Sequence, residues 1–131
     1  MKVADNITLI LCDDVREEAG NKYSLMGVYG AGLVFAHLPA LLPKLCVCIM
    51  LENVRTDFRE GNVTFKLPET EPTQIRLDVS KNIIGQNITL FAVMVPFRAK
   101  CAGEARVEVR FARNSKPSVV HKFHIKEAPK K

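Results

Sequence analysis

The chain has 131 residues, of which 47% are hydrophobic and 25% are charged. These values are ordinary for one globular domain, and they exclude a disordered, collagen-like or low-complexity chain. The formal net charge is +5, but it is unevenly spread: residues 98–131 carry ten Lys and Arg against three Asp and Glu, whereas residues 1–97 carry nine against eleven. The positive charge therefore belongs to the last quarter of the chain.

No stretch of the sequence predicts a membrane span or an export signal. The longest apolar runs, such as residues 45–51 and 90–95, are far shorter than the ~20 residues that cross a bilayer. The early apolar run at residues 7–12 follows a single basic residue and ends at two aspartates, unlike a signal peptide. We therefore expect a cytoplasmic protein without membrane contact, with association with a virion as an alternative, and four reduced cysteines.

Alternation of apolar and polar residues with a period of two predicts about eight short β-strands. In chain order, the expected strands span residues 6–12, 23–35, 45–54, 63–67, 74–79, 87–95, 104–112 and 119–125. Residues 13–22 are polar and acidic and are predicted to form a loop. Three glycines in the second expected strand, Gly27, Gly30 and Gly32, indicate a bulge, a bend or close backbone approach.

No segment has the period of a stable helix, so the predicted fold class is all-β. We expect a single-domain antiparallel β-sandwich, of jelly-roll or immunoglobulin-like type, over residues 1–126, followed by a polar tail at 127–131. The most apolar strands, 45–54 and 87–95, are predicted to be central. The expected core consists of Leu9, Val47, Ile49, Leu51, Leu90, either Phe91 or Ala92, Val107, Val109 and Phe111.

Cysteines and histidines do not form a recognisable catalytic or metal-binding motif. Cys46 and Cys48 share one face of a strand, but a zinc site needs further ligands, and the other two cysteines lie on unrelated segments. His121 and His124 are three residues apart, so on a strand they point to opposite faces. We expect structural cysteines, no metal, no cofactor and no enzymatic activity; a metal protein or small enzyme built on these residues is a further alternative.

An acidic cluster of Asp13, Asp14, Glu17 and Glu18 follows the first expected strand. Its spacing differs from the alternating oxygen ligands of a calcium loop. We expect these carboxylates to be solvated, or to pair with the basic last quarter of this chain or of a neighbouring chain.

The basic quarter contains both compensated and less compensated charges. Arg106 and Arg110 alternate with Glu104 and Glu108 on the outward face of one strand, which predicts an ion-pair ladder. Six less compensated cations are candidates for contact with a polyanion or a protein partner: Arg98, Lys100, Arg113, Lys116, Lys122 and Lys126. The chain lacks Trp and has only 7% aromatic residues, whereas single-strand nucleic-acid binders use exposed aromatic rings to stack bases.

Two segments of the first half carry a resemblance to a known family. They are Leu-Cys-Asp-Asp at residues 11–14, followed by Gly-Asn-Lys-Tyr-Ser-Leu-Met-Gly-Val-Tyr at 20–29, and Phe-Ala-His-Leu-Pro at 35–39. The sequence here resembles a family of small bacterial and phage-associated all-β proteins of unknown function. The resemblance implies a compact, mostly β domain, and it implies no catalytic residues.

Function is predicted from the fold class and the charge. The edge strands of a sandwich pair with other chains unless they are protected. We therefore expect a non-enzymatic binding or assembly module that makes protein–protein contacts, with a partner protein or with itself as a homo-oligomer. The alternative is binding of nucleic acid or another polyanion through the basic last quarter.

Overall fold

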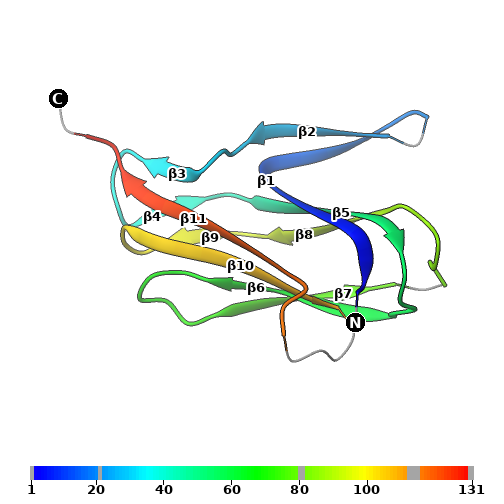
Figure 1. Ribbon diagram of the computed structural model, residues 1–131. Coiled ribbons are helices and arrows are strands. Elements are labelled where there is room, and N and C mark those ends of the chain that lie inside the picture. The colour runs from blue at the N-terminus through cyan, green and yellow to red at the C-terminus, as the bar shows by residue number, and fades with distance from the viewer. Residues whose placement is uncertain (1, 21, 80–81, 112–115, 130–131) are drawn as a thin grey trace.

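A computed structural model describes residues 2–20, 22–79, 82–111 and 116–129 of the chain. Over these residues the fold is all-β, with eleven strands and no helix (Figure 1). A four-stranded sheet, a five-stranded sheet and a two-stranded ribbon of β4 and β9 make up the fold. The strands are β1 (Ala4–Glu18), β2 (Lys22–Val28), β3 (Gly32–Phe35), β4 (Ala40–Leu42), β5 (Leu45–Val54), β6 (Glu60–Lys66), β7 (Thr73–Asp78), β8 (Ile88–Met94), β9 (Phe97–Ala99), β10 (Gly103–Phe111) and β11 (Val119–Glu127).

The expected number of about eight strands was too low. The second expected strand, residues 23–35, divides into β2 and β3, and between them the chain crosses from the four-stranded to the five-stranded sheet. The strands β4 and β9 have three residues each, which is too short for an alternating pattern to be recognised.

The four-stranded sheet has the order β2–β1–β5–β8, with antiparallel neighbours. β5 lies inside this sheet as predicted, and its Val47, Ile49 and Leu51 are buried. β8 was also expected to be central, but it lies at an edge. Both faces of β8 are apolar because the β1–β2 hairpin packs on its second face, where the rings of Tyr23 and Phe91 meet edge to face with centroids 4.9 Å apart.

The β1–β2 hairpin replaces the loop predicted at residues 13–22. β1 continues to Glu18 and pairs with β2 from Cys12 to Glu18. Polar side chains dominate this half of β1 because most of them are exposed to solvent, which conceals the strand in the sequence. In β2, Gly27 has a φ of +65°, a backbone conformation that other residues rarely adopt, and a Cβ atom there would also lie 2.3 Å from the side-chain Oδ2 of Asp13.

The five-stranded sheet has the order β3–β11–β10–β6–β7. The prediction of purely antiparallel pairing was wrong at its first pair, since β3 runs parallel to β11. The chain leaves β2 in the four-stranded sheet and crosses to the edge of β11, which it joins in the same direction. A Cβ atom on Gly32 would lie 2.4 Å from the backbone oxygen of His124. The close backbone approach predicted here is therefore confirmed, and it requires glycine.

Buried apolar side chains of both main sheets form one core. Most of the expected core residues are buried, namely Val47, Ile49, Leu51, Ala92, Val107, Val109 and Phe111. Leu9 and Leu90 are only half-buried and pack against that core from its margin. Ala92, rather than Phe91, is the buried member of the β8 pair.

Candidate binding groove between β1 and β11

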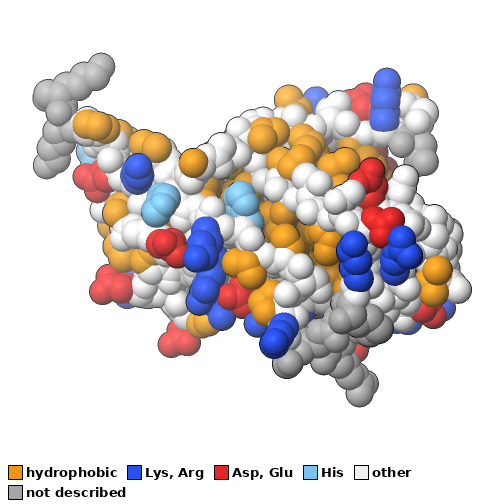
Figure 2. All heavy atoms as spheres, viewed as in Figure 1, with side chains coloured by type: hydrophobic (Ala, Val, Ile, Leu, Met, Phe, Trp, Pro, Cys, Tyr) orange, Lys and Arg blue, Asp and Glu red, His pale blue; other side chains and the backbone are white. Residues whose placement is uncertain are grey.

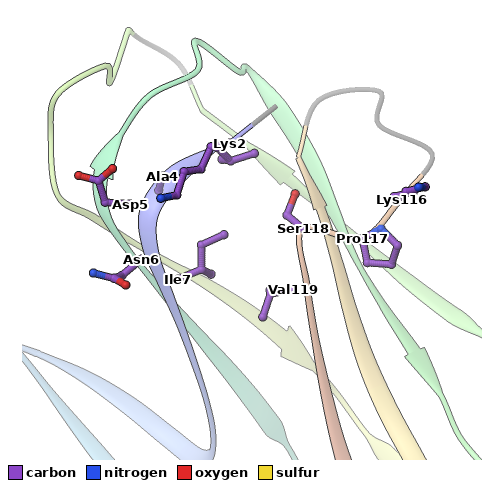
Figure 3. A pocket seen from close by; sticks show the side chains of 10 residues that line it. Lys2, Ala4, Asp5, Asn6, Ile7, Lys116, Pro117, Ser118 and Val119 are labelled. Carbon is purple, nitrogen blue, oxygen red and sulfur yellow. The ribbon is translucent and has the colours of Figure 1, made fainter.

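A cavity of about 680 Å³ lies between the beginning of β1 and the beginning of β11. Its lining comes from two segments far apart in the sequence, residues 2–7 and residues 116–119. Ile7 and Val119 extend from the two strands into the space between them (Figure 3). We call this space the β1/β11 groove. It lies at the junction of the two main sheets, where a strand of each sheet faces the other.

The edge of β1 that faces the groove has no ladder partner over residues 4–10 within the described chain. The opposite edge pairs with β5, and β2 joins the groove-side edge only from Cys12 onward. The backbone oxygen of Leu11 points to this side, since it accepts a hydrogen bond of 2.9 Å from the amide of Tyr29. Backbone groups alternate along a strand, so those of Ile7 and Leu9 point into the groove as well.

β11 also has a partly unpaired edge that faces the groove. Residues 119–125 pair with β10 on one side, and β3 covers the other side only from His124 to Glu127. The amide of His124 donates to the oxygen of Ala31 on that second side, at 3.2 Å. By the same alternation, the backbone groups of Val120 and Lys122 point to the open side, where the described residues supply no ladder partner.

The chain itself fills one end of the space between these strands. Residues 29–31, on the way from β2 to β3, bond to Leu11 of β1 through the Tyr29 amide and to His124 of β11 through the Ala31 oxygen. The connection from β2 to β3, whose path Figure 1 shows, therefore bonds to the edges of both strands. The other end, toward the beginnings of β1 and β11, carries the open backbone groups.

The inner side of the groove, which we call its floor, carries apolar side chains, although half of the ten lining residues are polar. Ile7, Leu9 and Val119 are half-buried and pack against the core. His121 is also half-buried and stacks on Phe123, with ring centroids 6.2 Å apart. Hydrophobic side chains are visible in the hollow between β11 and the first half of β1, and Lys and Arg side chains lie on either side of it (Figure 2).

The charges around the groove are mainly positive. Lys2 and Lys116 belong to its lining, and neither takes part in an ion pair within the described chain. The nearby carboxylate of Asp5 is already engaged: it accepts hydrogen bonds from Arg55 at 2.5 Å and from Asn53 at 2.7 Å. These bonds lower the pKa of Asp5 from 3.8 to about 2. The carboxylate is therefore ionised and neutralised by Arg55 at neutral pH.

The candidate basic residues of the last quarter separate into two places. Lys116 lines the groove, and Lys122 and Lys126 are exposed on the outward face of β11. Arg98 and Lys100 instead border a second cavity of about 410 Å³ beside the β4–β9 ribbon, together with Leu41 and Pro39. The last candidate, Arg113, lies outside the described residues.

The predicted ion-pair ladder on β10 is confirmed in part. Glu108 contacts Lys66 at 3.2 Å, Arg106 at 3.2 Å and Arg110 at 3.0 Å. Glu108 lies on the same face as these cations, yet it is only 4% exposed, because the three long side chains cover it. Burial would raise the pKa of Glu108, but the hydrogen bonds from Lys66 and Arg110 hold it below its usual value of 4.5.

A row of cations crosses the outward face of the five-stranded sheet. Lys122 of β11 stands opposite Arg106 of β10, which stands opposite Lys66 of β6. Glu108, two residues along β10 from Arg106, is a single carboxylate that contacts three cations. The positive field of this face therefore continues to the edge of β11 that borders the groove.

The acidic cluster does not pair with the basic last quarter within the described chain. Asp13 accepts a hydrogen bond from the hydroxyl of Tyr29, and Asp14 forms an ion pair with Lys44. Both contacts tie the hairpin to its own half of the molecule. Burial and the Asp13 contact raise the pKa of Tyr29 to about 12, which keeps its hydroxyl protonated.

Three of the cysteines lie together on the face of the four-stranded sheet beneath the hairpin. Cys12 stands directly opposite Cys46, and Cys48 follows two residues later on β5. All three are buried and free. Burial, followed by the neighbouring thiols, raises the pKa of Cys12 to about 11, so these cysteines are poor nucleophiles. No group of three or more metal-binding side chains occurs in the described part of the chain.

Comparison with known proteins does not identify the chain. No family model matches it, and no curated protein matches it significantly. The resemblance of residues 11–39 to small bacterial and phage-associated proteins stays a prediction. In the ranges that the structure describes, no helix has the length and apolar character to cross a membrane.

Sequence reasoning identified one lining residue, Lys116, but not the groove. An unpaired strand edge is a property of topology: Ile7 and Leu9 alternate with polar residues as they would in any half-buried strand. The one available signal was the glycine-rich stretch from Gly27 to Gly32, which marks the crossing that closes the far end.

Proposed function

We propose that this chain is a non-enzymatic protein-binding module that takes up an extended segment of a partner along the β1/β11 groove. The observation that carries the proposal is the crossing segment, residues 29–31, which pairs with both strand edges at the closed end. A partner strand at the open end would pair in the same way with the backbone groups that the crossing segment leaves open on β1 and β11. Strand addition of this kind derives affinity from main-chain hydrogen bonds and specificity from alternate side chains.

We further propose an immunoglobulin-like sandwich as the fold type, in preference to a jelly roll. The order β11–β10–β6–β7 in one sheet, facing β5 and β8 in the other, supports this type. The division of β2 and β3 between the two sheets, with β3 parallel to β11 at the sheet edge, is consistent with this type. In this arrangement, the groove is the seam between the sheets that the segment from β2 to β3 leaves partly open.

Selection from a displayed library of random peptides tests the proposal. The wild-type chain is compared with the double variant Ile7→Asn/Val119→Asn, which makes the groove floor polar, and with Val34→Asn, which alters an exposed apolar residue of β3. We expect enrichment of peptides on the wild type and on Val34→Asn, and its loss on the double variant, with all three proteins equally folded by circular dichroism. Equal enrichment on all three proteins, or enrichment on none, contradicts the proposal.

One observation favours a second candidate, the binding of a polyanion. Lys66, Arg106 and Lys122 form a row across three neighbouring strands. A nucleic acid bound there would lose affinity steeply as salt increases. A filter-binding assay with single-stranded and double-stranded DNA tests this function, and the absence of retention at low salt would exclude it.

A further inference from the structure

We propose that the segment bound in the β1/β11 groove alternates apolar and acidic side chains, and that it belongs to a different protein rather than to a second copy of this chain. This inference rests on the proposed function and specifies the class of partner. It follows from the two environments that a strand added to β11 would meet.

The first environment is the groove floor. Side chains of an added strand point alternately to the two faces of the sheet that it extends. On the inner face they meet the half-buried Ile7, Leu9 and Val119. Apolar side chains at every second position would cover these residues and remove their remaining exposed surface from water.

The second environment is the outward face of β11. Directly opposite side chains of neighbouring strands lie about 4.5–5.5 Å apart at their Cβ atoms. The outward side chains of an added strand would therefore stand beside Val120 and Lys122, with Arg106 and Lys66 in the same row behind. Acidic side chains complement this row, whereas basic side chains would be repelled.

The entrance to the groove is also positively charged. Lys2 and Lys116 line it, and the carboxylate of Asp5 is engaged by Arg55 and Asn53. An approaching acidic segment therefore meets two lysines and no uncompensated carboxylate among the described lining residues.

A second copy of this chain does not offer such a segment at its described edges. β2 reads Lys-Tyr-Ser-Leu-Met-Gly-Val and β8 reads Ile-Thr-Leu-Phe-Ala-Val-Met, and neither contains an acidic residue. β3 reads Gly-Leu-Val-Phe, and β7 alternates, but its one acidic residue, Asp78, is paired with the neighbouring outward Arg76. A nucleic acid would contact the row of cations, but it would neither cover the apolar floor nor form a β-ladder with the open backbone groups.

Fluorescence anisotropy with three labelled peptides of about nine residues and the full-length protein tests the inference. The first peptide alternates valine and glutamate, the second alternates valine and lysine, and the third has the composition of the first in two separate blocks. We expect the first peptide to bind about tenfold more tightly than either of the others, and to lose affinity as salt increases.

Two charge-reversal variants locate the effect. Lys122→Glu reverses the charge of an exposed lysine beside the groove. Lys100→Glu is its matched control, because it reverses the charge of an exposed lysine at the second cavity. We expect Lys122→Glu to weaken the valine–glutamate peptide about tenfold and to improve the valine–lysine peptide, and Lys100→Glu to change either affinity less than about twofold. Equal effects of the two variants would show binding by net charge alone and would overturn the inference.

The remaining outcomes separate this inference from the proposed function. If the valine–lysine peptide binds as tightly as the valine–glutamate peptide, and both are lost on Ile7→Asn/Val119→Asn, strand addition stands and the acidic partner is rejected. If library selection also yields no peptide that depends on the groove, the proposed function itself fails. Displacement of the first peptide by an oligonucleotide, or a stable dimer in sedimentation that excludes the peptide, would likewise overturn the inference.

Discussion

At one end of the space between β1 and β11, the crossing segment of residues 29–31 pairs with both strands. At the other end, the same two strands expose backbone groups that have no ladder partner among the described residues. The closed end depends on close backbone contact at Gly32, whereas the open end combines an apolar floor with a positive rim. One pair of strand edges therefore serves folding at one end and is available for binding at the other.

Disruption of the closed end has the largest expected effect on stability. Gly32→Ala places a Cβ atom 2.4 Å from the backbone oxygen of His124, so β3 has to move away from β11. We expect a loss of about 2 to 3 kcal/mol in the free energy of unfolding, measured by denaturant titration. Gly30→Ala is the matched control, because a Cβ atom there meets nothing within 4 Å. A small and equal effect of the two substitutions would refute the role of the close contact.

Removal of the buried carboxylate beside the open end has the next largest effect. Glu108→Gln leaves Lys66, Arg106 and Arg110 without their shared counter-ion. We expect it to cost about 1 to 2 kcal/mol of unfolding free energy at pH 7 and to tighten binding of the valine–glutamate peptide. A variant that is less stable but binds this peptide more weakly would show that Glu108 does not reduce the positive charge available to the peptide.

The stabilisation by Glu108 also depends on pH in a defined direction. The pKa of Glu108 is lower in the folded state than its usual value of 4.5. Its contribution is therefore fully present above about pH 4.5 and is lost as the pH falls through the folded-state pKa. We expect the stability difference between wild type and Glu108→Gln to shrink steadily below pH 4.5, and a constant difference would count against the ion-pair cluster.

A smaller effect concerns Asp5 at the groove entrance. Arg55 and Asn53 lower its pKa to about 2, so its contribution to stability is lost as the pH falls from 3.8 to about 2. We expect Arg55→Ala to raise the pKa of Asp5 toward 3.8, as measured by NMR titration of the carboxyl carbon. An unchanged value would mean that Arg55 does not neutralise Asp5 in solution.

The smallest expected effect on stability is at the open end itself. Lys122 is exposed and belongs to no ion pair in the described part of the chain. Lys122→Glu should change the free energy of unfolding by less than about 0.5 kcal/mol while it alters peptide binding. A larger loss of stability would place Lys122 in the framework of the fold rather than in a binding surface.

The sequence predicted the parts of the fold that depend on local pattern. The alternation around Val107 and Val109 and the apolar run around Val47 and Ile49 correctly marked β10 and β5, because one buried face imposes a period of two. The pattern failed for residues 13–18, which form a strand whose side chains are mostly in water. It also misplaced β8, since a hairpin on the outer face makes an edge strand as apolar as a central one.

The candidate site was less accessible to sequence reasoning than the fold. The basic residues were identified by charge, but charge did not reveal that Lys116 and Lys122 lie near one groove while Arg98 and Lys100 lie at another cavity. Nor could it reveal that Glu108 is buried beneath three cations. Both facts depend on which strands become neighbours, and that follows from long-range pairing.

Hydrogen–deuterium exchange by NMR on the free protein tests the open edges most directly. If the groove-side edge of β1 lacks a partner, the amides of Ile7 and Leu9 exchange rapidly, whereas those of Thr8 and Ile10, which point to β5, are protected. The same alternation should separate Val120 and Lys122 from His121 and Phe123 on β11. Binding of the valine–glutamate peptide should then protect Val120 and Lys122. Uniform protection along both strands in the free protein would contradict the existence of an open binding edge.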